Sequence, residues 1–141
     1  MSKQIFVVNG PNLNLLGTRE PDIYGSETLA DIEKSLSDSF KNVQFSFFQS
    51  NKEGELIDFL HLAKKQKADG IIINAGGYTH TSVAIRDAIS AISIPTIEVH
   101  LSNVFAREDF RHHSFISAVC KGIISGFGSK SYHLAVQSLL Y

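Results

Sequence analysis

Ile5-Phe6-Val7-Val8 is a continuous apolar run of mostly β-branched residues, and Asn9-Gly10-Pro11-Asn12 follows it directly. A run of this kind is typical of a strand that is buried on both faces of a sheet. The Gly-Pro pair ends the strand, because both residues favour turns. We therefore expect this stretch to belong to a sheet that helices cover on both sides.

Strand-like and helix-like segments alternate along the rest of the chain. Further strands are expected at residues 43 to 49, 71 to 73, 96 to 100 and 122 to 126. Apolar residues at helical spacing predict helices within residues 27 to 41, 56 to 63, 85 to 92 and 132 to 140. Ser50 and Glu53 have the spacing of a capping box before the second helix. Between residues 104 and 118 we expect only a short helical turn, from Arg107 to Phe110.

Strands that alternate with helices predict a parallel sheet with right-handed crossovers. Five strands in 141 residues indicate a flavodoxin-like α/β fold, a three-layer sandwich with the strand order 2-1-3-4-5. Internal repeats, low-complexity segments and Pro/Gly-rich linkers are absent from the sequence. Residues 1 to 141 are therefore expected to form a single domain.

The composition excludes several classes of function. Lys+Arg 13 and Asp+Glu 14 give a formal net charge of -1, so no overall field attracts nucleic acid or an anionic membrane. No stretch approaches the roughly 18 apolar residues of a membrane span. The single cysteine excludes an internal disulfide and fits a reducing compartment. We expect a cytoplasmic protein that binds neither nucleic acid nor membrane.

Polar stretches follow three of the expected strands. They are residues 9 to 12, 74 to 80 and 98 to 103. In an open parallel sheet, ligands bind beyond the carboxyl ends of the strands, so we expect one cleft there. Asn12 and Asn74 offer hydrogen-bond donors and acceptors to that cleft, whereas Asn9, Gly10 and Gly76 are interpreted as turn residues.

His80 and His100 also fall at this edge of the sheet. Glu98 lies two residues before His100 on one strand, so both side chains point to the same face. A carboxylate there could fix the imidazole tautomer and favour the protonated ring near neutral pH. His100 is the best candidate for an acid. The histidines show no metal-ligand spacing, and we expect no metal site.

The segment from 17 to 25 is a long connection, and long connections in small domains are often lids. Arg19 and Tyr24 lie within it, and a folded loop could bring guanidinium and phenol together. The alternative is a surface ion pair of Arg19 with Glu20 or Asp22. Spacing alone leaves both open.

Other charged groups and the cysteine have simpler interpretations. Arg107 is expected to form surface ion pairs, and Arg111 to point into the cleft. The pair Arg86-Asp87 is expected to be exposed on a helix and available to a subunit interface. Cys120 adjoins an apolar strand and is expected to be a buried, unreactive thiol.

Four stretches, which span nearly the whole chain, resemble the type II 3-dehydroquinate dehydratase family. They are NGPNLNLLGTREPDIYG at 9 to 25, QSNKEGELID at 49 to 58, YTHTSVAIRDA at 78 to 88 and EVHLSNVFAREDFRHHS at 98 to 114. The resemblance implies a flavodoxin-like enzyme that converts 3-dehydroquinate to 3-dehydroshikimate and water in the shikimate pathway. It also implies an enzyme without a cofactor that assembles as a dodecamer built from trimers.

The resemblance further implies roles for individual residues. Tyr24 corresponds to the proton-abstracting base, Arg19 to the lid arginine beside it and His100 to the proton donor, which Glu98 supports. Asn12 corresponds to the residue that helps hold a water facing the enolate oxygen. The substrate-binding positions correspond to Asn74, His80, Asp87, Leu101, Ser102 and Arg111. Gly77 and Ser131 depart from the family pattern, which commonly has alanine and glycine there.

Two other functions are compatible with the strand pattern. One is a non-catalytic flavodoxin-like module that binds flavin or a small anion. The other is a lyase that forms a Schiff base through a lysine.

Overall fold

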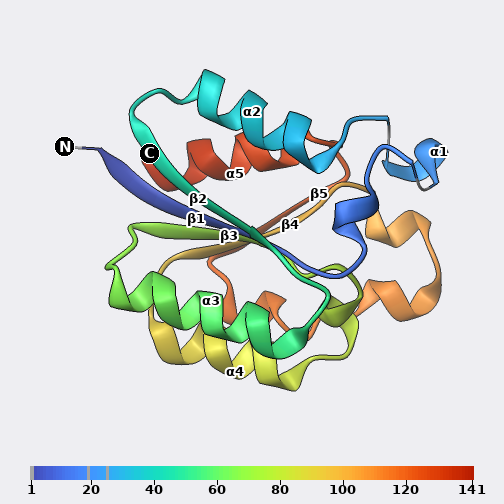
Figure 1. Cartoon of the computed structure of the whole chain (residues 1–141). Helices are drawn as coiled ribbons and strands as arrows, with labels where there is room; N and C mark the ends of the chain where they lie inside the picture. Colours follow the sequence, from blue (N-terminus) through green and yellow to red (C-terminus); the bar gives the residue numbers. More distant parts are fainter. Residues whose placement is uncertain (1, 19, 25) are drawn as a thin grey trace.

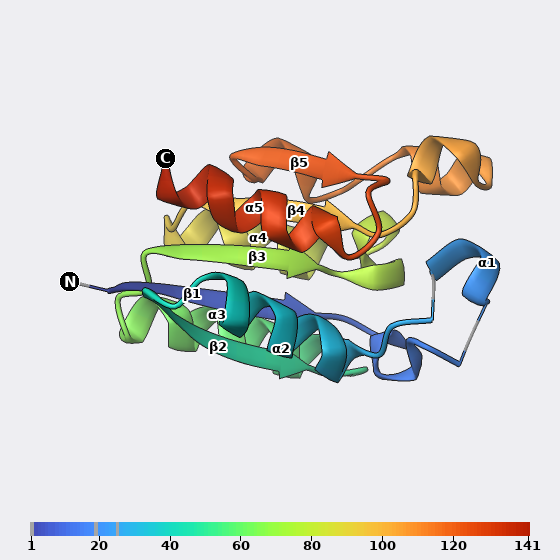
Figure 2. The same ribbon diagram turned by 90° about the horizontal axis from the view of Figure 1, so that it is seen from above.

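Five parallel strands form one sheet in the order β2-β1-β3-β4-β5, as the sequence predicted. The structure is a computed structural model that describes residues 2–18, 20–24 and 26–141, with only the helical placement of Tyr24 described. The strands are β1 (Lys3–Asn9), β2 (Val43–Gln49), β3 (Gly70–Asn74), β4 (Thr96–His100) and β5 (Gly122–Ser125). Figure 2 shows this order from β2 at one edge to β5 at the other.

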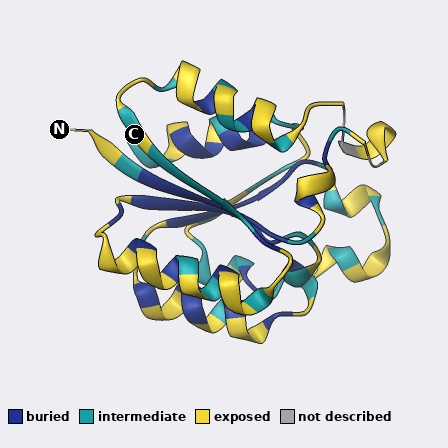
Figure 3. Ribbon diagram, viewed as in Figure 1, coloured by how far each residue is buried: buried dark blue, intermediate teal, exposed yellow. Residues whose placement is uncertain are grey.

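Two pairs of helices cover the sheet (Figure 1). Helices α2 (Leu29–Ser39) and α5 (Lys130–Leu140) lie on one face, and α3 (Glu53–Lys65) and α4 (Val83–Ile92) lie on the other. Each face has its own core, and β1 supplies both: Phe6 and Val8 pack on one side, and Ile5 and Val7 on the other. Figure 3 shows β1, β3 and β4 as the buried centre of the molecule.

The helix starts differ from the expected pattern. The capping box is at α2, where Thr28 and Asp31 exchange side-chain and backbone hydrogen bonds, and not at α3. The prediction of a box at Ser50 and Glu53 is wrong. The Ser50 hydroxyl donates to Glu55, and the Glu53 carboxylate accepts from the hydroxyl of Ser82. Both side chains therefore have partners other than each other.

Short turns replace regular structure in the loops. A single turn of helix, α1 (Pro21–Tyr24), lies within the segment expected to be a lid. The predicted turn from Arg107 to Phe110 is right only in part, because 3-10 turns form at Val104–Ala106 and Asp109–His112, and only the second overlaps the predicted range. Among the described residues, no helix combines the length and apolar character needed to cross a bilayer.

Two glycines allow backbones to meet closely. Gly10 donates its N–H to the carbonyl of Asn74 at 2.7 Å, and a Cβ on Gly10 would lie 2.3 Å from the carbonyl oxygen of Ala75. No larger residue fits there without moving one of the two strand ends. Gly17 has φ +93, and a Cβ there would lie 3.0 Å from the carbonyl oxygen of Ser26. The two ends of the segment from 17 to 25 therefore lie close together.

We expect Gly10→Ala to destabilise the protein by about 1 to 3 kcal/mol or more, because its Cβ would overlap backbone atoms that cannot rotate away. Gly77→Ala is the matched control, since a Cβ at Gly77 meets nothing within 4 Å. Thermal and denaturant unfolding of both variants checks the prediction. Equal unfolding midpoints for the two variants would contradict it.

Candidate active site

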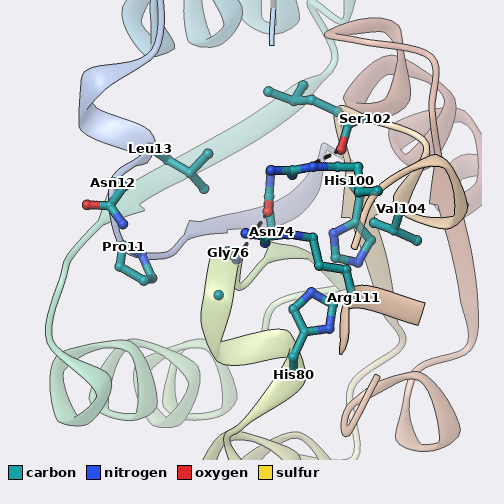
Figure 4. A pocket seen from close by; sticks show the side chains of 13 residues that line it. Pro11, Asn12, Leu13, Asn74, Gly76, His80, His100, Ser102, Val104 and Arg111 are labelled. Carbon is teal, nitrogen blue, oxygen red and sulfur yellow. Dashed lines mark hydrogen bonds between the residues drawn. The ribbon is translucent and has the colours of Figure 1, made fainter. Parts of the chain in front are cut away.

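A cavity of about 120 Å³ lies at the carboxyl ends of β1, β3 and β4. The three polar stretches singled out in the sequence meet there. The lining comprises Pro11, Asn12, Leu13, Asn74, Gly76, Gly77, His80, His100, Leu101, Ser102, Val104, Arg107 and Arg111. Figure 4 shows the side chains of Asn74, His80, His100 and Arg111 gathered around it. The cavity is thus polar and carries two guanidinium groups.

Glu98 and His100 form a buried pair on β4, as strand alternation predicted. The Nε2 atom of His100 lies 2.5 Å from Oε2 of Glu98, and the two residues are 8% and 1% exposed. Ser117 and Ser114 donate to the other carboxylate oxygen at 2.5 and 3.2 Å. Burial acts to raise the pKa of Glu98, but the hydrogen bonds from His100 and Ser117 outweigh it and hold that pKa below its usual value.

A charged carboxylate fixes the tautomer of its partner. Because the Glu98 carboxylate can only accept, Nε2 of His100 carries a hydrogen, and Nδ1 is the ring nitrogen left for other partners. Ser114 and Ser117 were not singled out in the sequence. Ser114 is the last residue of the fourth family-like stretch, and Ser117 lies beyond it. Only the fold brings both hydroxyls to the Glu98 carboxylate.

His80 has a different environment. Its Nδ1 atom lies 2.7 Å from the carbonyl oxygen of His113, which can only accept, so Nδ1 carries the hydrogen. Burial lowers the pKa of His80, and the nearby charges of His100 and Arg111 act in the same direction. The ring is nearly parallel to that of His100, with centroids 6.4 Å apart. His80 is therefore a neutral ring whose Nε2 is an acceptor.

Asn12 is held in an unusual backbone conformation. It has φ 69, in the left-handed region that asparagine tolerates better than most residues. Its N–H donates to Oδ1 of Asn51 at 2.9 Å, and the carbonyl of Asn51 accepts from the hydroxyl of Tyr78 at 3.0 Å. Asn51 therefore ties the β1 loop to the β3 loop. Sequence spacing gave no signal for this role.

The expectation of surface ion pairs for Arg107 is half right. Arg107 pairs with the exposed Glu108 at 3.8 Å, but its own side chain is 14% exposed, lines the cavity and donates to the Ser102 hydroxyl at 3.4 Å. The spacing argument assumed one helical turn, but Arg107 is extended between two 3-10 turns. Arg111, which also lines the cavity, donates to Glu108 at 2.9 Å.

Some of the expected site residues lie elsewhere. Asp87 is exposed on α4 and is not part of the cavity lining. Its neighbour Arg86 is only half-buried and donates to the carbonyl of Phe115 at 2.9 Å, so the expectation of a fully exposed pair holds for Asp87 alone. Arg19 and the side chain of Tyr24 lie outside the described residues.

Cys120 is partly buried, and burial raises the pKa of its thiol to about 12. The prediction of an unreactive thiol agrees with this environment. Within the described ranges, no group of three or more His, Cys, Asp or Glu side chains is placed to hold a metal ion. The residues that line the cavity include no lysine.

The fold and the cavity define a flavodoxin-like α/β protein that presents a polar, cationic cavity where the strand order reverses. The family model described as dehydroquinase class II matches residues 3–140. This chain belongs to the class II dehydroquinase family. The resemblance seen in the sequence is thereby confirmed.

Individual relatives agree over almost their full length. The chain is 56% identical over 141 residues to a 3-dehydroquinate dehydratase from Nitrobacter winogradskyi, which covers 99% of the chain and 90% of the relative. It is 59% identical over 138 residues to one from Trichodesmium erythraeum, and this match covers 96% of the chain and 91% of the relative. The crystal structure of type II dehydroquinase from Butyrivibrio crossotus has a TM-score of 0.97 at 46% identity and covers 99% of both chains.

Glu98→Gln is expected to lower the free energy of unfolding by about 2 kcal/mol or more near pH 7, because it removes a buried carboxylate that three donors bind. The folded-state pKa of Glu98 lies below its ordinary value of 4.5, so this stability is present above about pH 4.5 and is lost as the pH falls through the lower value. The difference from wild type should shrink on acidification.

Denaturant unfolding between neutral and acidic pH measures this difference. Asp38→Asn is the control, since it removes a carboxylate from an exposed ion pair with Lys34. That variant should stay close to wild type at every pH. A Glu98→Gln difference that did not change with pH would show that the buried carboxylate is not charged.

Proposed function

We infer that this chain dehydrates 3-dehydroquinate to 3-dehydroshikimate and water, a step of the shikimate pathway. Relatives that share 55% or more of its sequence over nearly the whole chain bear the name 3-dehydroquinate dehydratase. The observation that carries the mechanism is the buried Glu98–His100 pair beside a cationic cavity. A simple binding module has no need of such a pair.

The reaction itself defines the groups that the site must supply. A proton on the carbon next to a ketone is weakly acidic, so a base must take it while the developing enolate is stabilised. The hydroxyl on the adjacent carbon leaves as water only if an acid gives it a proton. The base gains one proton and the acid loses one in each turnover, and we assign these two steps to separate groups.

His100 is proposed as the acid. As an imidazolium it would carry hydrogens on both ring nitrogens, with the Nε2 hydrogen bound by the Glu98 carboxylate. After it gives the other proton to the leaving hydroxyl, the ring is neutral and keeps its bond to Glu98. The carboxylate therefore stabilises the acid before the step and fixes the ring after it.

The remaining cavity groups suit an anionic, hydroxylated substrate. The backbone N–H groups of Leu101 and Ser102, with the guanidinium of Arg111 nearby, are proposed to bind the carboxylate. Asn74 and neutral His80 are proposed to bind hydroxyl or ketone oxygens. Asn12 is proposed to help hold the water that faces the enolate oxygen.

Tyr24 is proposed as the base, with Arg19 beside it in a lid that spans residues 17 to 25. A free phenol has a pKa of about 10, so ionising it at pH 7 costs about 4 kcal/mol. A neighbouring guanidinium lowers the pKa of an acid by about 1 to 3 units, which supplies much of that difference. A tyrosinate base therefore requires an arginine of this kind.

Tyr24→Phe is expected to reduce turnover by several orders of magnitude while the fold is kept, because it removes only the group that takes the proton. Tyr141→Phe is the matched control, since Tyr141 is 98% exposed at the end of the chain. The assay follows formation of the conjugated enone from 3-dehydroquinate by ultraviolet absorbance. Substantial turnover by Tyr24→Phe would exclude it as the base, and no turnover by the wild type would overturn the function.

We propose that the enzyme assembles as a dodecamer built from trimers. We also propose that Asp87 acts in the site of a neighbouring subunit. The exposure of Asp87, outside its own cavity, supports this assignment. We also propose that residues 1 to 141 act as a single domain in the cytoplasm, where a lone free cysteine is compatible with reducing conditions.

Tyr24→Phe and Asp87→Ala should each be nearly inactive alone and should restore activity when they are co-expressed. In mixed trimers, some interfaces pair an intact Tyr24 on one chain with an intact Asp87 on the next. Separately assembled variants that do not exchange subunits should stay inactive when mixed. If hybrid oligomers verified by mass spectrometry have no activity above the two parents, Asp87 does not act across the interface.

A further inference from the structure

A buried chain of hydrogen bonds runs from Asn74 into the core beneath the cavity, and only Asn74 among its members has a role in the chemistry proposed above. The amide of Asn74 donates from Nδ2 to the phenol oxygen of Tyr132 at 3.1 Å, and the Tyr132 hydroxyl donates to Oδ1 of Asn9 at 2.5 Å. Asn9 and Asn74 face each other across β1 and β3 at the ends of these strands. Tyr132 belongs to α5, which packs with α2 on one face of the sheet, and its phenol reaches both asparagines. Asn9 and Tyr132 are fully buried, and Asn74 is 4% exposed.

The direction of this chain is fixed by its partners. The backbone N–H of Gly76 donates to Oδ1 of Asn74 at 3.2 Å, and only an oxygen can accept there. The amide nitrogen of Asn74 must therefore face Tyr132. The phenol oxygen accepts from it, and the phenol hydrogen goes to Asn9. Burial raises the pKa of Tyr132, so the phenol keeps its hydrogen.

As a stabilising device the arrangement is poor. The Nδ2 atom of Asn9 has no hydrogen-bond partner among the described residues, although it is buried. An unsatisfied buried donor typically costs about 1 to 3 kcal/mol, and an apolar core in the same space would avoid it. The arrangement is better explained by what it does to Asn74, which lines the cavity.

We infer that Tyr132 is a positioning residue for substrate binding: it holds the Asn74 amide so that its second N–H serves a substrate oxygen in the cavity. The inference rests on the proposed role of Asn74 in binding substrate. One N–H of the amide is bound to Tyr132 and Oδ1 is bound to Gly76, so the amide cannot rotate. Without the phenol, one of these two restraints is lost.

Tyr132→Phe in the full-length enzyme is the test, because it removes the hydroxyl and keeps the ring in the core. We expect the KM for 3-dehydroquinate to rise about five- to tenfold, with kcat changed by less than about twofold, as for an interaction made equally in ground and transition states. Ser131→Ala is the matched control. Ser131 is buried next to Tyr132 and accepts from the N–H of Phe127, whereas the Asn74 side chain bonds to Tyr132 and Gly76.

The control separates positioning from stability. Both variants are expected to lower the thermal midpoint, and only Tyr132→Phe is expected to raise KM. An equal rise in KM for Ser131→Ala would overturn the inference, because the effect would then come from a loosened helix. An unchanged KM for Tyr132→Phe would overturn it as well.

A double-mutant cycle with Asn74→Ala identifies the residue through which Tyr132 acts. Tyr132→Phe should raise KM in the wild type and cause no further rise in the Asn74→Ala background. A further rise there would overturn the inference. If Asn74→Ala leaves KM unchanged, the proposed role of Asn74 fails. If Asn74→Ala raises KM and Tyr132→Phe does not, only the positioning role fails.

A second variant covers the case in which Tyr132→Phe does not fold. Asn9→Ala removes the acceptor of the phenol hydrogen and leaves the aromatic ring in place. The Tyr132 hydroxyl is then free to donate to Oδ1 of Asn74, where it would compete with the N–H of Gly76. We expect KM to rise in this variant too, and an unchanged KM would overturn the inference.

Discussion

The cavity depends on one backbone contact, the hydrogen bond from Gly10 to the carbonyl of Asn74. It joins the ends of β1 and β3, the adjacent strands from which the chain leaves toward opposite faces of the sheet. The β1 loop and the β3 loop can diverge from this point only because their backbones first meet so closely. The side chains of Asn12, Asn74 and His80, which we assign to the site, all lie at or after these two strand ends, so their positions depend on that contact.

Charge is placed in the site by a different means. The carboxylate of Glu98 is buried under the cavity, where three donors compensate for its loss of water. The guanidinium groups of Arg107 and Arg111 remain nearer to solvent, at 14% and 21% side-chain exposure. The site thus has a buried negative charge behind His100 and positive charges at the cavity wall, which suits an anionic substrate.

Sequence patterns predicted those features that depend on local periodicity. The five strands follow from apolar runs, and the Glu98–His100 pair follows from the two-residue repeat of a strand. The position of Arg107 at the cavity was not predicted, because 3-10 turns do not follow helical spacing. Asn51 and Tyr132 gave no local signal. The two loops that Asn51 joins lie 39 and 27 residues from it, and the side-chain partners of Tyr132 lie 58 and 123 residues away. The tertiary fold alone brings them to the site.

The close approach of Gly17 and Ser26 brings together the two ends of the segment from 17 to 25. The distance between these ends is therefore fixed independently of the length of chain between them. Doubling the length of such a loop costs only about 0.6 kcal/mol of closure entropy. Segments of different length and composition could thus be exchanged between these two residues, and the fold that builds the cavity would stay intact.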